Sequence, residues 1–383
     1  MDFQVPEELS MMVESVRRFR EEELMPLERE FLLNGELPES TRLRLEERGR
    51  ELGFWALDVP KKDGGQELGE LAMCMIAEEL YKHPMMFEFG GSPEPSLYMC
   101  NEEQKQRFYH SVIAGKRRCC YAFTEPDTGS DFARIRTVAV RDGNDWVING
   151  RKTFISHVER ADFLILFATT NPKLGGRGVT CFLVDKGTPG FGISKKIATM
   201  GDGWAPCELS FENCRVPDAN RLGGLDQGWK IANHQLTHGR LRIAAYQLGI
   251  AKRCIDLAIE WAKARTTWGK PIGSRQAIQW MLVDSHVELE AARLLVYRAA
   301  ALADGGKSSD SRTEAFVAKL YAAEMSGRVT DRCLQVFGGM GYTKEVPVQS
   351  FYRQARLWRI GHGTSEIHRW MIARDLLQLS ASD

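Results

Sequence analysis

The sequence predicts an α+β protein in which an N-terminal helical domain, a middle β-barrel-like domain and a C-terminal four-helix bundle follow one another. Three features of the 383 residues predict it: helically spaced apolar residues early in the chain, short apolar or alternating runs in the middle, and four long amphipathic segments at the end. We place the domains at residues 1–118, 119–225 and 226–383. A chain of this length can form two or three domains.

The first domain is expected to be helical because its apolar residues recur every three or four positions. The earliest such set is Leu9, Met12, Val16 and Phe19. Similar spacing predicts helices from about Ser40 to Gly53 and from Leu68 to Tyr81. Another helix should begin after Asn101, because asparagine caps helix N-termini and acidic residues follow it.

The second domain is expected to consist of strands. Residues 137–140 and 146–149 flank Asp142-Gly143-Asn144, a sequence typical of a hairpin turn. Further strands are indicated by apolar or alternating runs at 163–167, 179–184 and 209–211.

The third domain is expected to be a bundle, because four long segments are apolar on one face only. These segments are residues 238–264, 276–304, 312–337 and 365–379. No repeat of 20–50 residues and no low-complexity tract interrupts the order of the three domains.

Charge and cysteine content argue against several classes of protein. Lys and Arg together number 51, as do Asp and Glu, so no net charge draws the chain to nucleic acid or to an anionic membrane. No apolar run approaches the roughly 20 residues of a membrane span, and residues 1–8 do not resemble a secretory signal. The nine cysteines include no Cys-x-x-Cys pair, which favours free thiols over disulfides or a metal site. We therefore expect a cytoplasmic protein without a metal ion.

Two segments carry the residues most typical of ligand binding. The first is Tyr121-Ala122-Phe123-Thr124-Glu125-Pro126-Asp127-Thr128-Gly129-Ser130-Asp131. The second is Gly361-His362-Gly363-Thr364-Ser365-Glu366, which opens the last helix. The proline and the polar residues predict that the first segment is a binding loop and not a core strand.

These two segments and three others give the chain a resemblance to the acyl-CoA dehydrogenase family over essentially its whole length. The others are Asn149-Gly150-Arg151-Lys152-Thr153-Phe154-Ile155-Ser156, Arg265-Thr266-Thr267-Trp268-Gly269-Lys270-Pro271-Ile272 and Gln335-Val336-Phe337-Gly338-Gly339-Met340-Gly341-Tyr342. The resemblance implies a non-covalent FAD where the β domain meets the bundle, an acyl-CoA substrate, and hydride transfer from its β-carbon to flavin N5. It also implies fatty acid metabolism, a homotetramer or dimer of dimers, and an electron-transferring flavoprotein as partner.

The resemblance assigns two sets of residues to FAD. Around the flavin ring it places Tyr121, Phe123, Thr124, Gly129, Ser130, Phe154, Ile155 and Ser156. Around the diphosphate it places Arg265, Thr267, Gln276, Gln335, Val336, Phe337, Gly338 and Gly339, reached from a neighbouring subunit, with Thr364 and Glu366 at the start of the last helix. The competing interpretations are that Thr124 and Ser130 only stabilise a turn, and that the glycines only cap a helix.

Arg240 matches a family arginine near the substrate thioester, and Ser130, Thr237 and Gly363 are also expected to contact the substrate. A surface salt bridge is the competing explanation for Arg240. The family's catalytic base is a glutamate that precedes the Gly-Thr pair or, in some relatives, precedes this arginine. Here those two positions hold His362 and Gly239, so neither usual carboxylate is present.

Three explanations for the missing carboxylate stay open. Neutral His362 could itself be the base, since imidazole has a suitable pKa. The base could instead be His238, Glu88 or Glu94. Alternatively, no strong base is needed, because the protein reduces an enoyl-CoA, as crotonobetainyl-CoA reductase does, or processes an acyl-CoA without oxidation.

The preferred interpretation is FAD-dependent α,β-dehydrogenation of an acyl-CoA, with His362 and Arg240 as catalytic residues. Polar Thr237 and His238 hint at a short or functionalised acyl chain. A flavin-dependent enoyl-CoA reductase is the alternative within the family. A non-catalytic or DNA-associated flavoprotein is the alternative in another class, which the balanced charge disfavours.

Overall fold

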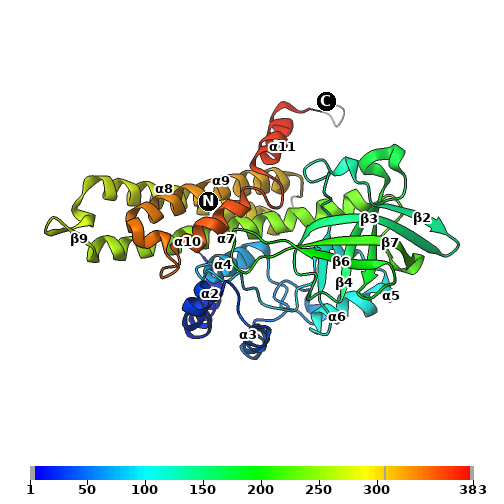
Figure 1. The fold of residues 1–383 in the computed structure, drawn as a ribbon, viewed down its shortest axis with the longest axis horizontal. Helices are drawn as coiled ribbons and strands as arrows, with labels where there is room; N and C mark the ends of the chain where they lie inside the picture. Colours follow the sequence, from blue (N-terminus) through cyan, green and yellow to red (C-terminus); the bar gives the residue numbers. More distant parts are fainter. Residues whose placement is uncertain (1–4, 306–307, 380–383) are drawn as a thin grey trace.

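The computed structural model describes residues 5–305 and 308–379 and confirms the predicted order of helices, sheet and helical bundle (Figure 1). The β domain occupies one end of an elongated molecule and the bundle occupies the other. The N-terminal helices pack below the region where the two meet. The N-terminal stretch 1–8, expected to lack a secretory signal, lies partly outside the described residues.

The described residues of the N-terminal domain form six α-helices, joined by short helical turns and by two longer loops. The helices are α1 Glu7–Phe19, α2 Glu28–Asn34, α3 Glu39–Glu51, α4 Glu70–Leu80, α5 Glu102–Gln104 and α6 His110–Ile113. The apolar stripe predicted for α1 is confirmed, since Val16 and Phe19 are buried. The predicted cap is also confirmed, because Asn101 Oδ1 accepts a hydrogen bond from the Gln104 backbone N–H at 2.9 Å.

The β domain is one eight-stranded mixed sheet in the order β6-β7-β3-β2-β4-β5-β8, with β1 paired to β4. Its strands are β1 Cys119–Ala122, β2 Val138–Asp142, β3 Asp145–Ile155, β4 Phe163–Thr169, β5 Val179–Asp185, β6 Phe191–Lys196, β7 Cys207–Pro217 and β8 Arg221–Leu222. Every residue of β4 is buried. Side chains from β1, β3, β4, β5 and β7 share one apolar cluster, so the sheet curls around its own core as a barrel-like domain does.

The C-terminal bundle is built on three long helices. Its elements are α7 Gly228–Ala264, β9 Thr266–Thr267, β10 Lys270–Pro271, α8 Gln276–Asp304, α9 Ser308–Phe337, α10 Val348–Trp358 and α11 Ser365–Leu377. The β9–β10 hairpin lies at the end of the bundle farthest from the β domain (Figure 1).

The structure differs from the elements predicted from the sequence at four places. Tyr121 and Ala122 belong to strand β1, which pairs in parallel with β4, so only the later part of that segment is a loop. Helix α7 begins at Gly228, ten residues before the predicted start at 238. Strand β6 was not predicted; its residues are half-buried or exposed, which leaves no strong apolar pattern.

The fourth correction concerns the bundle. The short helix α10, missed in the sequence, packs against α7 and α9 and buries Val348, Phe351 and Ala355. Helix α11, which was expected to be the fourth bundle helix, packs mainly on α9 among the described elements and projects from the molecule (Figure 1). Just before the loop that precedes α11, Arg353 of α10 donates to the Met200 carbonyl of the β domain at 2.6 Å.

The N-terminal helices and the bundle share one apolar core. Helix α4 crosses α7 at Gly249, where a Cβ atom would stand 2.3 Å from the Glu78 carbonyl oxygen. Only glycine permits this close approach. The contact fixes the N-terminal domain against the helix that carries Gly239 and Arg240.

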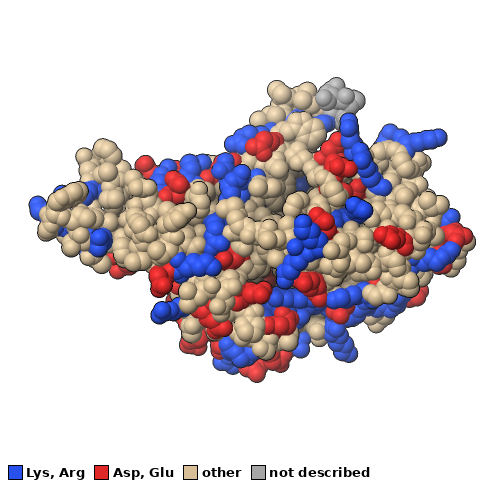
Figure 2. All heavy atoms as spheres, viewed as in Figure 1, with Lys and Arg blue, Asp and Glu red and all other residues tan. Residues whose placement is uncertain are grey.

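The surface and the thiols agree with the composition. Acidic and basic side chains are interspersed over the face shown in Figure 2. All nine cysteines are free, and eight are buried. Among the described helices, none combines the length and the apolar character that crossing a membrane requires.

Candidate active site

The first predicted loop is held by a buried ion pair. Lys152 of β3 is fully buried, and its Nζ donates to the Phe123 carbonyl at 3.0 Å and to Glu125 Oε1 at 2.8 Å. Glu125 also accepts from the backbone N–H groups of Arg136 and Thr137, at 2.6 and 2.9 Å. Burial lowers the pKa of Lys152 to about 8, although Glu125 opposes this shift. The start of the loop is therefore fixed relative to β3.

The end of β3 presents a flat apolar surface beside this loop. Phe154 is 54% exposed and has a positive φ of 57°, an unusual combination for an aromatic residue in a strand. Ile155 is buried in the sheet core, so only its backbone can meet a ligand. Ser156 Oγ accepts a hydrogen bond from Trp204 Nε1 at 2.8 Å. Phe154 is thus free to stack on a planar group.

The remaining residues expected at the flavin ring differ in whether their side chains are free to contact a ligand. The ring of Phe123 is committed to packing, since it stacks on Phe132 at 4.1 Å. The buried Tyr121 hydroxyl, in contrast, has no hydrogen-bond partner among the described residues. A buried hydroxyl without a partner is an unusual feature that a ligand or water would satisfy. Gly129 and Ser130 are exposed, and Thr124 is half-buried.

The second loop places His362 against helix α7. A Cβ atom at Gly239 would meet His362 Nδ1 at 3.1 Å and Cε1 at 3.3 Å. His362 and Gly363 both have positive φ, 54° and 92°. Thr364 then caps α11, because its Oγ1 accepts from the Ile367 N–H at 3.2 Å. The two positions expected to hold the family's glutamate therefore meet in space, and the imidazole of His362 lies there.

Lys319 and His368 bind the carbonyl groups around His362. Lys319 of α9 is fully buried, and its Nζ donates to the carbonyls of Gly361 and Gly363 at 2.9 and 2.8 Å. His368 Nε2 lies 3.3 Å from the His362 carbonyl. A carbonyl only accepts, so neutral His368 must carry its proton on Nε2. Three successive carbonyls of the loop are thus bound by two side chains.

Arg240 lies in the same region, and no acidic residue in the described part of the chain forms an ion pair with it. It is 7% exposed, and its guanidinium carbon stacks 4.4 Å over the ring of Phe316. Its Nε has no acceptor among the described residues. Burial and the charge of Arg312 lower the pKa of Arg240 to about 10, and it stays charged at neutral pH. The surface salt bridge considered as an alternative for Arg240 is therefore wrong.

The environment of His362 favours the neutral imidazole. Solvent reaches the side chain, yet the protein packed around it and the charges of Lys319 and Arg240 lower its pKa to about 4. The ring can therefore accept a proton at neutral pH. The same cations make it a weaker base than a histidine in water.

The other candidate bases are already engaged. His238 Nδ1 lies 2.7 Å from Glu70 Oε1. Glu88 accepts hydrogen bonds from the hydroxyls of Tyr81 and Tyr246.

Glu94 accepts from Gln235 Nε2, and burial raises its pKa. Gln235 lies one helical turn before Gly239 on α7, so Glu94 is held against the helix face that carries Gly239. Thr237 donates to the Asn233 carbonyl of its own helix at 2.9 Å.

The residues expected at the diphosphate lie at the opposite end of the bundle. Arg265, Gln276, Gln335, Gly338 and Gly339 are exposed around the β9–β10 hairpin and the end of α9, Thr267 is half-buried, and Val336 and Phe337 point into the core. At 1.5 Å per residue, the end of α7 lies roughly 36 Å from Arg240. One chain therefore does not bring the two FAD sets together. Glu366 is exposed on the first turn of α11, near His362 in sequence.

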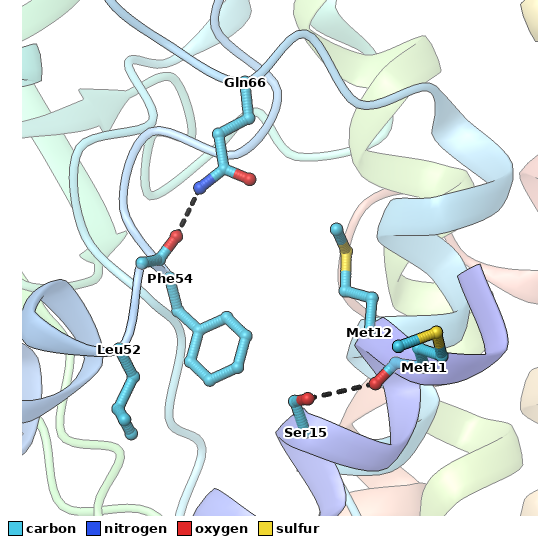
Figure 3. A pocket seen from close by; sticks show the side chains of 7 residues that line it. Met11, Met12, Ser15, Leu52, Phe54 and Gln66 are labelled. Atoms are coloured by element: carbon cyan, nitrogen blue, oxygen red, sulfur yellow. Dashed lines mark hydrogen bonds between the residues drawn. The ribbon is translucent and has the colours of Figure 1, made fainter. Parts of the chain in front are cut away.

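A separate hollow lies away from these residues. It encloses about 320 Å³ between α1 and the segment after α3, and is lined by Met11, Met12, Ser15, Leu52, Gly53, Phe54 and Gln66 (Figure 3). Ser15 bonds to the carbonyl of Met11 at 3.0 Å, within its own helix. The lining contains no titratable group, so this hollow is not the candidate active site.

Lys319, His368 and Phe316 were missed in the sequence. Lys319 interrupts a helix face of small buried residues that includes Ala315, Ala318 and Ala322. A lysine at such a position is unusual, because lysine is almost never fully buried without a partner. That signal identifies a functional lysine, but it does not reveal that the partner is the His362 loop.

Comparison with known proteins agrees with this geometry. Models of the N-terminal, middle and C-terminal domains of acyl-CoA dehydrogenases match residues 6–116, 120–214 and 226–377. The chain is 37% identical to an acryloyl-CoA reductase (NADH) of Anaerotignum propionicum, covering 99% of this chain and 96% of that protein. It is 36% identical to the human mitochondrial short-chain specific acyl-CoA dehydrogenase, covering 98% and 91%. It superposes on the FAD complex of PigA with a TM-score of 0.90 at 28% identity, covering 99% and 100%.

The fold and the two loops define a flavoenzyme class in which a β domain and a helical bundle share the cofactor. The chain belongs to the acyl-CoA dehydrogenase family. It is an FAD-dependent oxidoreductase that acts on a CH–CH bond of an acyl-CoA, by dehydrogenation or by reduction of the enoyl-CoA.

Proposed function

We propose that this enzyme dehydrogenates an acyl-CoA across its α,β bond, and that His362 takes the α-proton. The contact between His362 and Gly239 carries this assignment, because it puts an imidazole where both of the family's carboxylate positions converge. His362 is neutral above pH 4 and can accept the proton. Its basicity is low, so the reaction benefits from any negative charge that offsets Lys319 and Arg240.

The residues of this chain fit FAD at both expected places. Near the flavin ring, Phe154 offers an exposed face and Tyr121 an unpaired hydroxyl. Near the diphosphate, the Arg265 side chain makes no hydrogen bond or ion pair with any described residue. Bound FAD supplies the two-electron acceptor that the chemistry needs. The protein orients the substrate, controls the α-proton and limits access of water.

Reduction of an enoyl-CoA is the second candidate, favoured by the 37% identity to an acryloyl-CoA reductase. Anaerobic mixing with a panel of thioesters separates the two directions. Saturated acyl-CoAs should bleach the oxidised flavin if the enzyme is a dehydrogenase. An enoyl-CoA that re-oxidises the chemically reduced flavin, while saturated thioesters leave the oxidised enzyme unchanged, would establish the reductase instead.

The role of His362 is tested by a matched pair of histidine substitutions. His362→Ala should lower the rate of flavin reduction by about 10²–10⁴, the usual contribution of a general base. His238→Ala should leave the rate within a few fold, since that ring is paired with Glu70. A parental rate in His362→Ala, measured by stopped-flow absorbance, would remove the base assignment. A large loss in His238→Ala would transfer it.

We propose that the enzyme assembles as a homotetramer, or dimer of dimers, in which a neighbouring subunit supplies the diphosphate site. The separation of Arg265 from Arg240 supports this assembly. Helix α8 also exposes an apolar stripe at Trp280, Val283, Val287 and Leu294, each more than half exposed. Light scattering gives the oligomeric state. Mixing Arg265→Ala chains with His362→Ala chains should restore part of the activity if each complete site uses two chains.

An electron-transferring flavoprotein is proposed as the redox partner, and a cytoplasmic location in fatty acid metabolism stays a prediction. Family membership supports the partner. Turnover with saturated acyl-CoA and a purified electron-transferring flavoprotein, compared with an artificial dye alone, tests it. Turnover with the dye only would exclude that partner.

A further inference from the structure

The described part of the chain buries four lysine or arginine side chains, and only two have an acidic partner. Arg20 lies 3.2 Å from Glu79, and Lys152 lies 2.8 Å from Glu125. Arg240 and Lys319 are 7% and 0% exposed and pair with no carboxylate. An unpaired buried charge costs several kcal/mol of folding free energy. Burial and the charge of Arg240 lower the pKa of Lys319 to about 7, so Lys319 is only partly charged at neutral pH and Arg240 carries the lasting positive charge.

The two unpaired cations lie together beside His362. Lys319 holds the carbonyls on both sides of His362, and the charge of Arg240 helps to lower the pKa values of Lys319, His362 and His368. The ring of Phe316, on which Arg240 stacks, lies 5.5 Å from the ring of His368. The cations therefore surround the position that lacks a glutamate.

Among the described residues, no acid neutralises these two cations. Glu324 is the one acid that acts on Lys319, and it is engaged by Arg359 at 3.0 Å and by Arg369 at 3.7 Å. Arg312 adds a further positive charge. The Lys319 ammonium uses two of its three donors on carbonyls, and the Arg240 Nε has no acceptor. Donors that carry charge and lack acceptors are suited to an anionic oxygen.

We propose that the negative charge comes from the substrate, and that the acyl group of the thioester carries a carboxylate that pairs with Arg240. The phosphates of coenzyme A cannot fill this role, because the pantetheine arm separates them from the α-carbon at His362. Arg240 stacks on Phe316, whose ring lies against that of His368 at the His362 carbonyl, so a carboxylate paired with Arg240 lies within a few bonds of the α-carbon at His362. The substrate class is therefore a short dicarboxylic acyl thioester with four or five carbons in the acyl chain.

Such a substrate also improves the chemistry at His362. A carboxylate beside Arg240 offsets one of the charges that weaken the imidazole as a base. The substrate would thus help to activate the residue that takes its proton. This substrate class presupposes the acyl-CoA activity proposed above, and the experiment is arranged so that the two can fail separately.

The test measures equilibrium binding of matched thioesters to the FAD-loaded enzyme. Succinyl-CoA is compared with butyryl-CoA, and glutaryl-CoA with its monomethyl ester, by calorimetry and by perturbation of the flavin spectrum. The dicarboxylic member of each pair should bind about tenfold tighter or better, the usual strength of a charge-assisted hydrogen bond. Equal affinity within each pair would overturn the carboxylate while leaving the dehydrogenase intact. Failure of all four to bind would instead remove the acyl-CoA activity.

Three variants sharpen the assignment. Arg240→Gln should abolish the preference for the dicarboxylic member, and Arg240→Lys should keep part of it. Arg328→Gln is the matched control, since Arg328 of the neighbouring helix α9 pairs with Glu288 at 2.8 Å and its loss should leave the preference unchanged.

A final variant restores the missing charge. His362→Glu supplies a carboxylate beside both cations and should reverse the preference toward butyryl-CoA. A preference that survives in both Arg240→Gln and His362→Glu would show that another group binds the carboxylate. If Arg240→Gln does not fold, the comparison of ligands on the parent enzyme still decides the matter.

Discussion

Two fully buried lysines hold the two loops of the active site, and they differ in one respect. Lys152 binds the Phe123 carbonyl and carries its counter-charge, Glu125, within the protein. Lys319 binds the carbonyls of Gly361 and Gly363 and has no carboxylate. A buried lysine therefore holds loop carbonyls at both places. At the first loop its charge is neutralised by a carboxylate, whereas at the second loop it is not. The difference places the uncompensated charge beside His362, the residue proposed to take the α-proton.

The largest effect should follow removal of the paired lysine. Lys152→Met leaves Glu125 buried and unpaired, which should lower the free energy of unfolding by about 3–5 kcal/mol. FAD content should fall as well, because the loop at the flavin ring loses its anchor. Denaturant titration and the ratio of flavin to protein absorbance measure both.

The double variant Lys152→Met with Glu125→Gln provides the control for this effect. Removing both charges should recover part of the lost stability, since no buried charge remains unpaired. A single variant as stable as the parent would show that Lys152 does not anchor the loop through its charge.

Removal of the unpaired lysine should separate activity from stability. Lys319→Met deletes two hydrogen bonds but leaves no acid unpaired, so the cost in unfolding free energy should be about 1–2 kcal/mol. The His362 loop loses its support, and kcat should fall about 10²-fold, as expected for a small displacement of a reacting group. Stopped-flow kinetics at saturating substrate measure the loss. A parental kcat would mean that the backbone alone positions His362.

Sequence periodicity predicted the long helices of both terminal domains because their apolar faces repeat locally, but the short helices α2 and α10 were missed. The motifs likewise identified the two loops. The pairing of Lys319 with the His362 loop could not be predicted, since the partners lie more than forty residues apart and meet only through the packing of α9. Nor could the contact between His362 and Gly239 be predicted, because it depends on the left-handed backbone of the loop. Local patterns thus predicted the elements, and tertiary packing created the charge imbalance.

The histidines offer a smaller and more specific comparison. Burial lowers the pKa of both His83 and His368 to about 3, and nearby cations add to the shift: Arg253 and Arg20 at His83, Lys319 and Arg240 at His368. The unfolded chain, with pKa values near 6.5, then binds more protons than the folded one between pH 6.5 and 3. Stability should be complete above pH 6.5 and fall by about 1 kcal/mol per histidine by pH 5.5. Succinyl-CoA should reduce the share from His368, as judged by comparing His368→Gln with His83→Gln in denaturant titrations.

The lowered pKa of His362 should also be visible in the pH dependence of kcat/KM. The pKa of about 4 at His362 means that kcat/KM should stay flat as the pH falls from 8 to 5.5, without the decline near 6.5 that an ordinary histidine base gives. A decline near 6.5 that disappears in His362→Gln would show that the surrounding protein does not depress this pKa.

The smallest effect should come from two glycines of the same helix. Gly239→Ala replaces an interior glycine of α7, which favours the helix by about 0.5–1 kcal/mol. Its Cβ would stand 3.1 Å from His362 Nδ1, so the ring must move by a few tenths of an ångström, and kcat should fall only a few fold. Gly249→Ala is the matched control, since its Cβ would stand 2.3 Å from a backbone oxygen of α4 and should destabilise the protein instead. Thermal unfolding with kinetics on both variants separates the contacts: a Gly239→Ala enzyme with lower stability and unchanged kcat would mean that His362 does not rest on α7.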